Sequence, residues 1–283
     1  MLGIRQLDRN GLDRLLAMGA AEGWNLGCGD ADAFWAQDPE AFIGAEFAGV
    51  PIGGGSIVTY GDRYGFMGLF LLKPEFRGRG FGRSLWFVRR DRLLARLAPG
   101  ASIGMAAVND MRPFYERGGF RADHLEVRYE WTARAAGTDD TRLADAHAVD
   151  RDALHAFDAL HFPAPRPRFL DAWIAPDDRH ALVATEGGAI TGFIAARPAM
   201  RGHRIGPLFA RDAEVAAALL EGIERRLDGR ILQLDVPEVN AEGTALAKRR
   251  GAREVFSCTR MHYGPAPELP WNRIFGVTSF ELG

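Results

Sequence analysis

The chain has little cysteine and no long apolar run. Among its 283 residues there are two cysteines, Cys28 and Cys258, and neither belongs to a C-x-x-C pair. This scarcity argues against a disulfide framework and a zinc site, and it fits a reducing compartment. No stretch approaches the roughly 18 apolar residues of a membrane span. Charges near Met1 stand where a signal peptide would have its apolar core, so we expect a cytoplasmic protein.

An excess of charge of one sign is also absent. The formal net charge is −2, whereas a nucleic-acid-binding protein usually carries a basic excess. We therefore expect no nucleic-acid partner, and no membrane partner either. The seven histidines form no H-E-x-x-H or similar set, so we expect no metal. The length suits two domains of about 100–150 residues each, in a monomer or a homodimer.

The chain is organised around residues 68–86, which the pattern predicts to be a buried strand, a glycine-rich turn and a helix. Three glycines at alternate positions, Gly78, Gly80 and Gly82, let the backbone approach a ligand and turn its N–H groups one way. The helix starting near Phe81 adds unpaired N–H donors and a favourable dipole. Positive charge around the turn comes from Arg77, Arg79 and Arg83. We interpret the turn as a pyrophosphate cradle.

Three kinds of phosphate site compete for this turn. A P-loop needs G-x-x-x-x-G-K-[ST], which does not occur in the chain. A dinucleotide fold needs G-x-G-x-x-G, but Arg83 stands at the third glycine position when counting from Gly78. The segment from Arg77 to Gly82 does match R/Q-x-x-G-x-G/A. It resembles motif A of the GNAT superfamily, the acyl-CoA-dependent N-acyltransferases.

A second motif extends the resemblance. Asn109, followed by FYERGGF from Phe114 to Phe120, is similar to motif B of that superfamily. The two motifs occur in the expected order, each at a predicted strand–helix junction. The alternative is that the glycines only form a turn and that Tyr115 only packs in the core.

The second half of the chain repeats the predicted order of strands and helices, with Asn240 in the position of Asn109. The whole chain resembles a tandem GNAT protein of the YitH-like type. The resemblance implies an α/β (α+β) fold with two GNAT-like domains, each a mixed, mostly antiparallel sheet flanked by helices. We expect a catalytic domain at 1–134, a linker at 135–140, and a degenerate GNAT-like domain with a C-terminal tail at 141–283.

The two halves differ at the cradle. The corresponding turn of the second half, residues 208–214, has no glycine, and Asp212 can cap the helix in place of a phosphate. The position of Tyr115 falls near Leu246 or Ala247, which have no proton to give. We therefore expect only the first half to bind acyl-CoA.

The resemblance implies direct transfer, in which the acceptor amine attacks the thioester carbonyl while both substrates are bound. The strand at 66–72 would part from its neighbour at a bulge. The N–H of Phe70 or Leu71 would polarise the acetyl oxygen, and Leu72 would pair with the pantetheine. Tyr115 would donate a proton to the departing thiolate, and Asn109 would contact the pantetheine or orient the nearby backbone. The cofactor-binding set is Phe70, Leu71, Leu72, Arg77, Gly78, Arg79, Gly80, Phe81, Gly82, Arg83 and Asn109.

The chain departs from the family pattern at the general base. Many relatives have a glutamate on the cradle strand where this chain has Phe66, which cannot accept a proton. A water chain could serve instead. So could one of three side chains that are otherwise expected to be solvated hairpin residues, namely Asp62, Tyr64 and Glu46.

We expect an acetyl-CoA-dependent N-acetyltransferase that acts on the amine of a small molecule. The substrate residues are expected to be Trp24, Asn25 and Tyr64, with Phe34 nearby, although Trp24 and Phe34 could equally pack in the core. Phe66 leaves open a non-catalytic acyl-CoA sensor or regulatory module, and a protein or O-acyltransferase would share every motif. No residue pattern names the acceptor.

Overall fold

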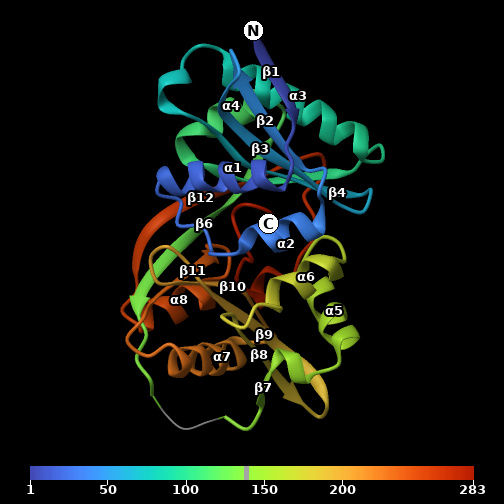
Figure 1. Ribbon diagram of the computed structural model, residues 1–283. Coiled ribbons are helices and arrows are strands. Elements are labelled where there is room, and N and C mark those ends of the chain that lie inside the picture. Colours follow the sequence, from blue (N-terminus) through green and yellow to red (C-terminus); the bar gives the residue numbers. More distant parts are fainter. Residues whose placement is uncertain (137–139) are drawn as a thin grey trace.

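The computed structural model describes residues 1–136 and 140–283, so part of the predicted linker lies outside the described residues. The first half contains β1 (Leu2–Gln6), α1 (Arg9–Ala21), α2 (Asp30–Gln37), β2 (Phe42–Phe47), β3 (Val50–Tyr60), β4 (Tyr64–Leu72), α3 (Phe81–Arg96), β5 (Ser102–Val108), α4 (Arg112–Arg117) and β6 (Arg121–Thr132). The second half contains β7 (Leu143–Asp145), α5 (Arg151–Ala159), α6 (Pro167–Ile174), β8 (His180–Glu186), β9 (Ala189–Pro198), β10 (His203–Ala210), α7 (Ala213–Arg226), β11 (Ile231–Pro237), α8 (Ala241–Arg249), β12 (Arg253–Tyr263) and β13 (Ile274–Gly276). Figure 1 shows the first half in the upper part of the view and the second half below it. Within the described residues, no helix is long and apolar enough to cross a membrane.

Two helix starts in the first half illustrate where local sequence signals work and where they fail. The sequence offers Asp8 or Asn10 as the cap of α1, and Asp8 is the cap, since its carboxylate accepts the N–H of Gly11 at 2.7 Å. The sequence also predicts that Asp30 caps the short helix that carries Phe34 and Trp35, and this prediction is wrong. Asp30 is the first residue of the helix, and its buried carboxylate instead binds Arg197 at 2.8 Å and Arg179 at 3.4 Å. Both arginines belong to the second half, so the carboxylate joins the two halves.

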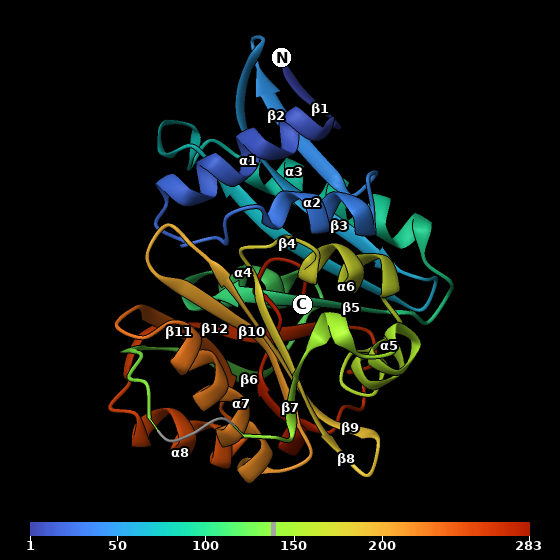
Figure 2. The ribbon, with the colours of Figure 1, turned by 60° about the horizontal axis from the view of Figure 1, so that its bottom comes forward.

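The strands form one continuous sheet in the order β1-β2-β3-β4-β5-β12-β6-β11-β10-β9-β8-β7, with β13 paired to β10. The last long strand of each half is exchanged. β12 lies between β5 and β6, and β6 lies between β12 and β11. Figure 2 shows β6 and β12 side by side at the centre of the molecule. The mixed, mostly antiparallel sheet that the resemblance implied is confirmed, and each half completes the sheet of the other.

A wedge opens in the first half where two parallel strands part. β4 and β5 pair only from Tyr64 opposite Ser102 to Phe66 opposite Gly104. On its other edge β4 carries the expected bulge, because the register with β3 shifts beyond Gly68 and Leu69 has a left-handed φ of 52°. Residues 67–72 of β4 therefore have a free edge on the β5 side.

The second half has a matching wedge, and the chain itself fills it. β10 and β11 pair in parallel only from His203 to Ile205. Beyond that point β13 pairs with β10, with Gly276 opposite Leu208 and Ile274 opposite Phe209. The apolar residues of the tail from Pro265 to Gly283 predict that it docks partly as a strand, and β13 confirms this.

We predict that Asp30→Asn destabilises the protein strongly. The change would leave the buried guanidinium of Arg197 without its counter-ion, and breaking a buried pair in this way typically costs about 3–5 kcal/mol. The matched control is Glu186→Gln, which removes the exposed partner of Arg211 and should cost less than about 1 kcal/mol. The free energy of unfolding from urea titrations checks both. Equal costs for the two variants would show that Asp30 does not join the halves.

Candidate functional site

The glycine-rich turn is open at the molecular surface. Gly78 and Gly80 have left-handed φ values of 73° and 82°, and a Cβ on either would meet no described atom within 4 Å. α3 begins directly afterwards at Phe81, and no described side chain caps its first turn. Since the first N–H groups of a helix have no partner within it, this turn leaves donors free for an anion.

The three arginines of the turn differ in their surroundings. Arg77 donates to the carbonyl of Leu72 at 2.8 Å and binds the carboxylate of Glu22 at 2.5 Å, so it ties the turn to β4 and α1. Arg79 and Arg83 are exposed, and among the residues described neither meets a carboxylate. Arg79 stacks instead at 5.0–5.5 Å from the ring centres of Phe47, Phe76 and Phe81. The charges of Arg79 and Arg83 can therefore face a bound anion.

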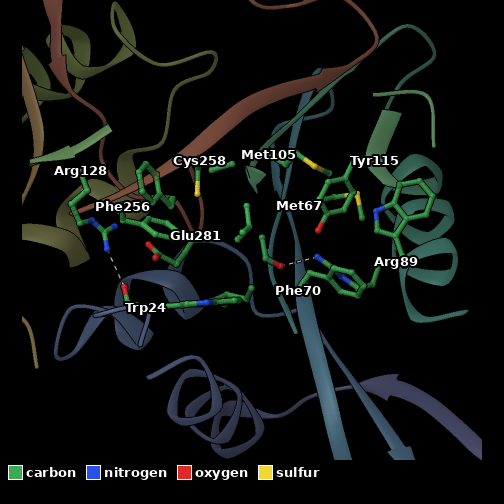
Figure 3. A pocket seen from close by; sticks show the side chains of 16 residues that line it. Trp24, Met67, Phe70, Arg89, Met105, Tyr115, Arg128, Phe256, Cys258 and Glu281 are labelled. Carbon is green, nitrogen blue, oxygen red and sulfur yellow. Dashed lines mark hydrogen bonds between the residues drawn. The ribbon is translucent and has the colours of Figure 1, made fainter. Parts of the chain in front are cut away.

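A pocket of about 640 Å³, counted with its open mouth, fills the wedge between β4 and β5. The wall on the α3 side carries Met67, Phe70, Trp86, Arg89, Met105 and Tyr115. The opposite wall carries Trp24, Leu69, Phe256, Cys258, Phe280 and Glu281. Figure 3 shows Tyr115 on one side of the pocket and Glu281 on the other. Because the wedge passes between the strands, a group held in it can be reached from both faces of the sheet.

Tyr115, the expected proton donor, lies on the α3-side wall. Burial raises the pKa of Tyr115 to about 12, and the nearby charge of Arg89 opposes the rise. The phenol therefore keeps its proton through neutral and mildly alkaline pH, which is the state that a proton donor needs. The rings of Phe70 and Trp86, each 6.4 Å away between centres, hold its orientation.

Arg89 is a site residue that the sequence does not reveal. The apolar stripe of α3 predicts that its arginines face solvent, but Arg89 is buried against Gly55 of β3. Its Nη2 donates to the carbonyls of Ser56 at 2.6 Å and Gly68 at 2.7 Å, on the two strands that flank the bulge. Burial without a described carboxylate partner lowers the pKa of Arg89 to about 10. It fixes the bulge and places a positive charge beside Tyr115. The signal in the sequence was Gly55, where a Cβ would lie 2.2 Å from Cζ of Arg89.

Asn109 uses its side chain within the protein. Its Nδ2 donates to the hydroxyl of Ser257 at 2.9 Å, and its Oδ1 accepts from the hydroxyl of Thr259 at 2.8 Å. Both partners lie on β12, so Asn109 fastens the end of β5 to the exchanged strand. Of its two expected roles, orienting the nearby backbone fits these bonds.

The residues expected to contact the substrate are distributed over three places. Trp24 lines the wedge pocket. Asn25 does not, because its amide bonds to the backbone of Arg201 and to Gln233. Tyr64 is buried beside a different cavity, and Phe34 is fully buried in the core, where it stacks on Trp173. The structure therefore brings only Trp24 to the wedge.

The candidate bases named from the sequence also lie away from the wedge. Asp62 is exposed in the turn between β3 and β4, and Glu46 on β2 pairs with Arg5 at 3.3 Å. Phe66 is fully buried. In the described parts of the chain, no group of three or more His, Cys, Asp or Glu side chains could hold a metal ion.

Four residues of the wall opposite Tyr115 come from segments more than a hundred residues further along the chain. Phe256 and Cys258 lie on the exchanged β12, and Phe280 and Glu281 lie on the segment after β13. Sequence reasoning missed them because only the strand exchange brings them to the first half. Burial raises the pKa of the Cys258 thiol far above its usual range, so this cysteine is not a thiolate nucleophile.

The corresponding features of the second half are occupied. Asp212 caps α7 by accepting the N–H of Val215 at 3.0 Å, as expected, and it pairs with Arg211. β13 lies in the wedge next to β10. Leu246 and Ala247, near the position of Tyr115, are buried apolar residues.

Comparisons with known proteins match each half of the chain to an acetyltransferase family model. A model described as Acetyltransferase (GNAT) family matches residues 11–120, and a model described as Acetyltransferase (GNAT) domain matches residues 154–276. Holothin acyltransferase from Pseudoalteromonas sp. (strain SANK 73390) is 28% identical over 270 residues, which cover 93% of this chain and 88% of that protein.

Two solved structures share the whole fold. A putative acetyltransferase from Pyrococcus horikoshii has a TM-score of 0.85 at 21% identity, covering 100% of this chain and 96% of that one. A tandem GNAT protein from the clavulanic acid biosynthesis pathway has a TM-score of 0.65 at 16% identity, covering 95% and 100%. The fold of the whole chain is thus also found in a protein described as a tandem GNAT protein.

Proposed function

Because the chain belongs to the GNAT acyltransferase superfamily, with one GNAT domain in each half, we propose that its first half is an acetyl-CoA-dependent N-acetyltransferase that acts on the amine of a small molecule. The observation that carries this proposal is the open wedge between β4 and β5, which runs past Tyr115 and begins near an uncapped glycine-rich turn. The similarity to holothin acyltransferase supports acyl transfer as the activity.

The cofactor would bind along these two features. Its pyrophosphate would lie on the free N–H groups of the turn, near Arg79 and Arg83, and the pantetheine would enter the wedge. The free edge of β4 offers backbone groups to the pantetheine at Leu72, and the N–H of Phe70 or Leu71 to the thioester oxygen. A fixed donor aimed at developing oxyanion charge can be worth roughly 3–4 kcal/mol.

The transfer would be direct. The amine nitrogen attacks the carbonyl carbon, the carbon–sulfur bond breaks, and Tyr115 gives its proton to the departing thiolate. The protonated thiol of Cys258 supports this route over a covalent intermediate on the enzyme. The aromatic rings of Trp24, Phe256 and Phe280 would surround an acceptor with apolar or aromatic character.

The second half would bind no acyl-CoA. Its helix start is capped by Asp212, and β13 stands in its wedge. Through β12 and the segment that follows β13, it would instead form part of the wall of the first half's pocket.

A non-catalytic acyl-CoA sensor is the second candidate. It is favoured by the buried Phe66, which stands where many relatives have a glutamate that can act as general base. The two candidates differ in turnover. Release of coenzyme A that depends on added amine would exclude the sensor, whereas slow thioester hydrolysis alone, unchanged by a broad set of amines, would favour it.

We predict that Gly80→Asp abolishes measurable binding of acetyl-CoA. The new carboxylate would stand where the phosphates bind, and a loss of about tenfold or more in Kd corresponds to about 1.4 kcal/mol or more. The matched control is Gly187→Asp, which adds the same charge at another exposed glycine with positive φ, in the second half. Isothermal titration calorimetry measures both, and equal affinities for the two variants would reject the cradle.

We also predict that Tyr115→Phe lowers kcat by roughly 100-fold and leaves the affinity for acetyl-CoA unchanged, because the phenol acts on the leaving thiolate. Since the pKa of Tyr115 is raised to about 12, its proton is present at every pH below that value. Removal of the phenolic hydroxyl in Tyr115→Phe should therefore lower kcat by the same factor at every pH from 6 to 9. An unaltered kcat would remove Tyr115 from the mechanism.

A further inference from the structure

The segment that follows β13 crosses from the filled wedge of the second half to the open wedge of the first. Val277 donates its N–H to the carbonyl of Asp235 at 2.9 Å, and Thr278 accepts from Arg166 at 2.8 Å. Further on, the carbonyl of Leu282 accepts from the hydroxyl of Tyr60 at 2.8 Å. These bonds hold residues 277–283 at fixed points in both halves.

Gly68 on β4 makes room for this segment. A Cβ at position 68 would lie 1.8 Å from the carbonyl oxygen of Glu281, which no real contact allows. The bulge turns Gly68 and Leu69 toward the face opposite α3. The missing side chain of β4 is thus replaced by the backbone of residue 281, directly beside the wedge.

The carboxylate of Glu281 is buried, and only one of its two oxygens has a hydrogen-bond partner among the described residues. Its Oε1 lies 3.3 Å from Nη1 of Arg204, while its Oε2 has no hydrogen-bond partner among the described residues. Leaving a buried carboxylate oxygen unpaired costs free energy, so such an oxygen is a candidate for binding a ligand. Glu281 lines the wedge pocket, on the wall opposite Tyr115 (Figure 3).

The charged groups around Glu281 keep one state near neutral pH. Burial raises the pKa of Asp235 on β11, but Arg128 on β6 and Arg204 on β10 outweigh burial and lower that pKa to about 2. Burial likewise opposes a charge on Arg204, but its carboxylate neighbours raise its pKa above the usual value. The thiol of Cys258 on β12 stays protonated.

We propose that Glu281 is the base that takes the proton from the acceptor amine, and that the C-terminal segment supplies the carboxylate that β4 lacks at Phe66. This inference rests on the proposed function. The amine nitrogen bonds to the carbonyl carbon and loses its proton to Oε2 of Glu281. The carbon–sulfur bond breaks, and the thiolate takes the proton of Tyr115. Glu281 then releases its proton to water and Tyr115 regains one, so the products are an amide and free coenzyme A.

The placement explains why acid and base lie on opposite walls. The leaving sulfur departs toward Tyr115 on the α3 side, and the amine approaches from the side of Trp24, Phe280 and Glu281. Because the amine would arrive from one wall and the sulfur would depart toward the other, the two proton transfers are separate, and neither group has to serve both.

The test uses the full chain with Glu281→Gln, which keeps the shape of the side chain and its bond to Arg204. The substrates are acetyl-CoA with 2-phenylethylamine, and with water alone for basal thioester hydrolysis. We expect release of coenzyme A to fall by about 100-fold, the range of general base catalysis. Calorimetry should give an unchanged Kd for acetyl-CoA. The fall of the wild-type kcat toward acidic pH should be absent from the variant.

Two further variants separate a chemical role from a structural one. Ser279→Ala removes only the hydroxyl that accepts the N–H of Leu282, and should leave the rate within about threefold of wild type. Gly68→Ala should push the segment away, raising amide hydrogen exchange over residues 277–283 and lowering the rate as Glu281→Gln does.

The outcomes distinguish the two proposals. A wild-type chain that does not bind acetyl-CoA would refute the proposed function itself. Binding and release of coenzyme A with a Glu281→Gln rate within threefold of wild type would refute the role of Glu281 alone. A rate loss with the acidic limb retained would show that Glu281 only positions its neighbours.

Discussion

The exchange of β6 and β12 is the constraint on which the rest of the structure depends. β12 pairs with β5 on one edge and with β6 on the other, and β6 continues the sheet into β11. Buried ion pairs cross these strands, with Arg260 bound to Glu126 at 2.8 Å and Arg128 bound to Asp235 at 2.6 Å. Because either charge alone would be costly to bury, these pairs penalise any other arrangement of the strands. Neither half has a complete sheet without the other.

The exchange gives the two wedges different contents. In the second half β13 takes the place beside β10, so the backbone groups there are already paired. The segment that follows β13 then continues to the first half, where it forms part of a wall of the open wedge. One half has thus kept an open pocket, and the other supplies part of its lining. In this way both halves contribute to a single pocket.

The sequence predicts the parts of the site that depend on neighbouring residues. The glycine-rich turn and the bulge of β4 follow from motifs whose geometry is local. Arg89 was missed because its burial depends on glycines of another strand. Asn25 and Asp30 were misassigned because their partners lie in the second half. Glu281 could not be found at all, since nothing in its own neighbourhood shows that the tail reaches β4. Long-range placement, rather than local propensity, is what the sequence leaves undetermined.

The central claim is that one wedge holds acyl-CoA and the other is closed by the chain itself. The stoichiometry of acetyl-CoA binding to the full chain, measured by isothermal titration calorimetry, tests this most directly. We expect one molecule of acetyl-CoA to bind per chain. Two molecules per chain would show that the second wedge also opens, and no binding would show that the first wedge is not a cofactor site.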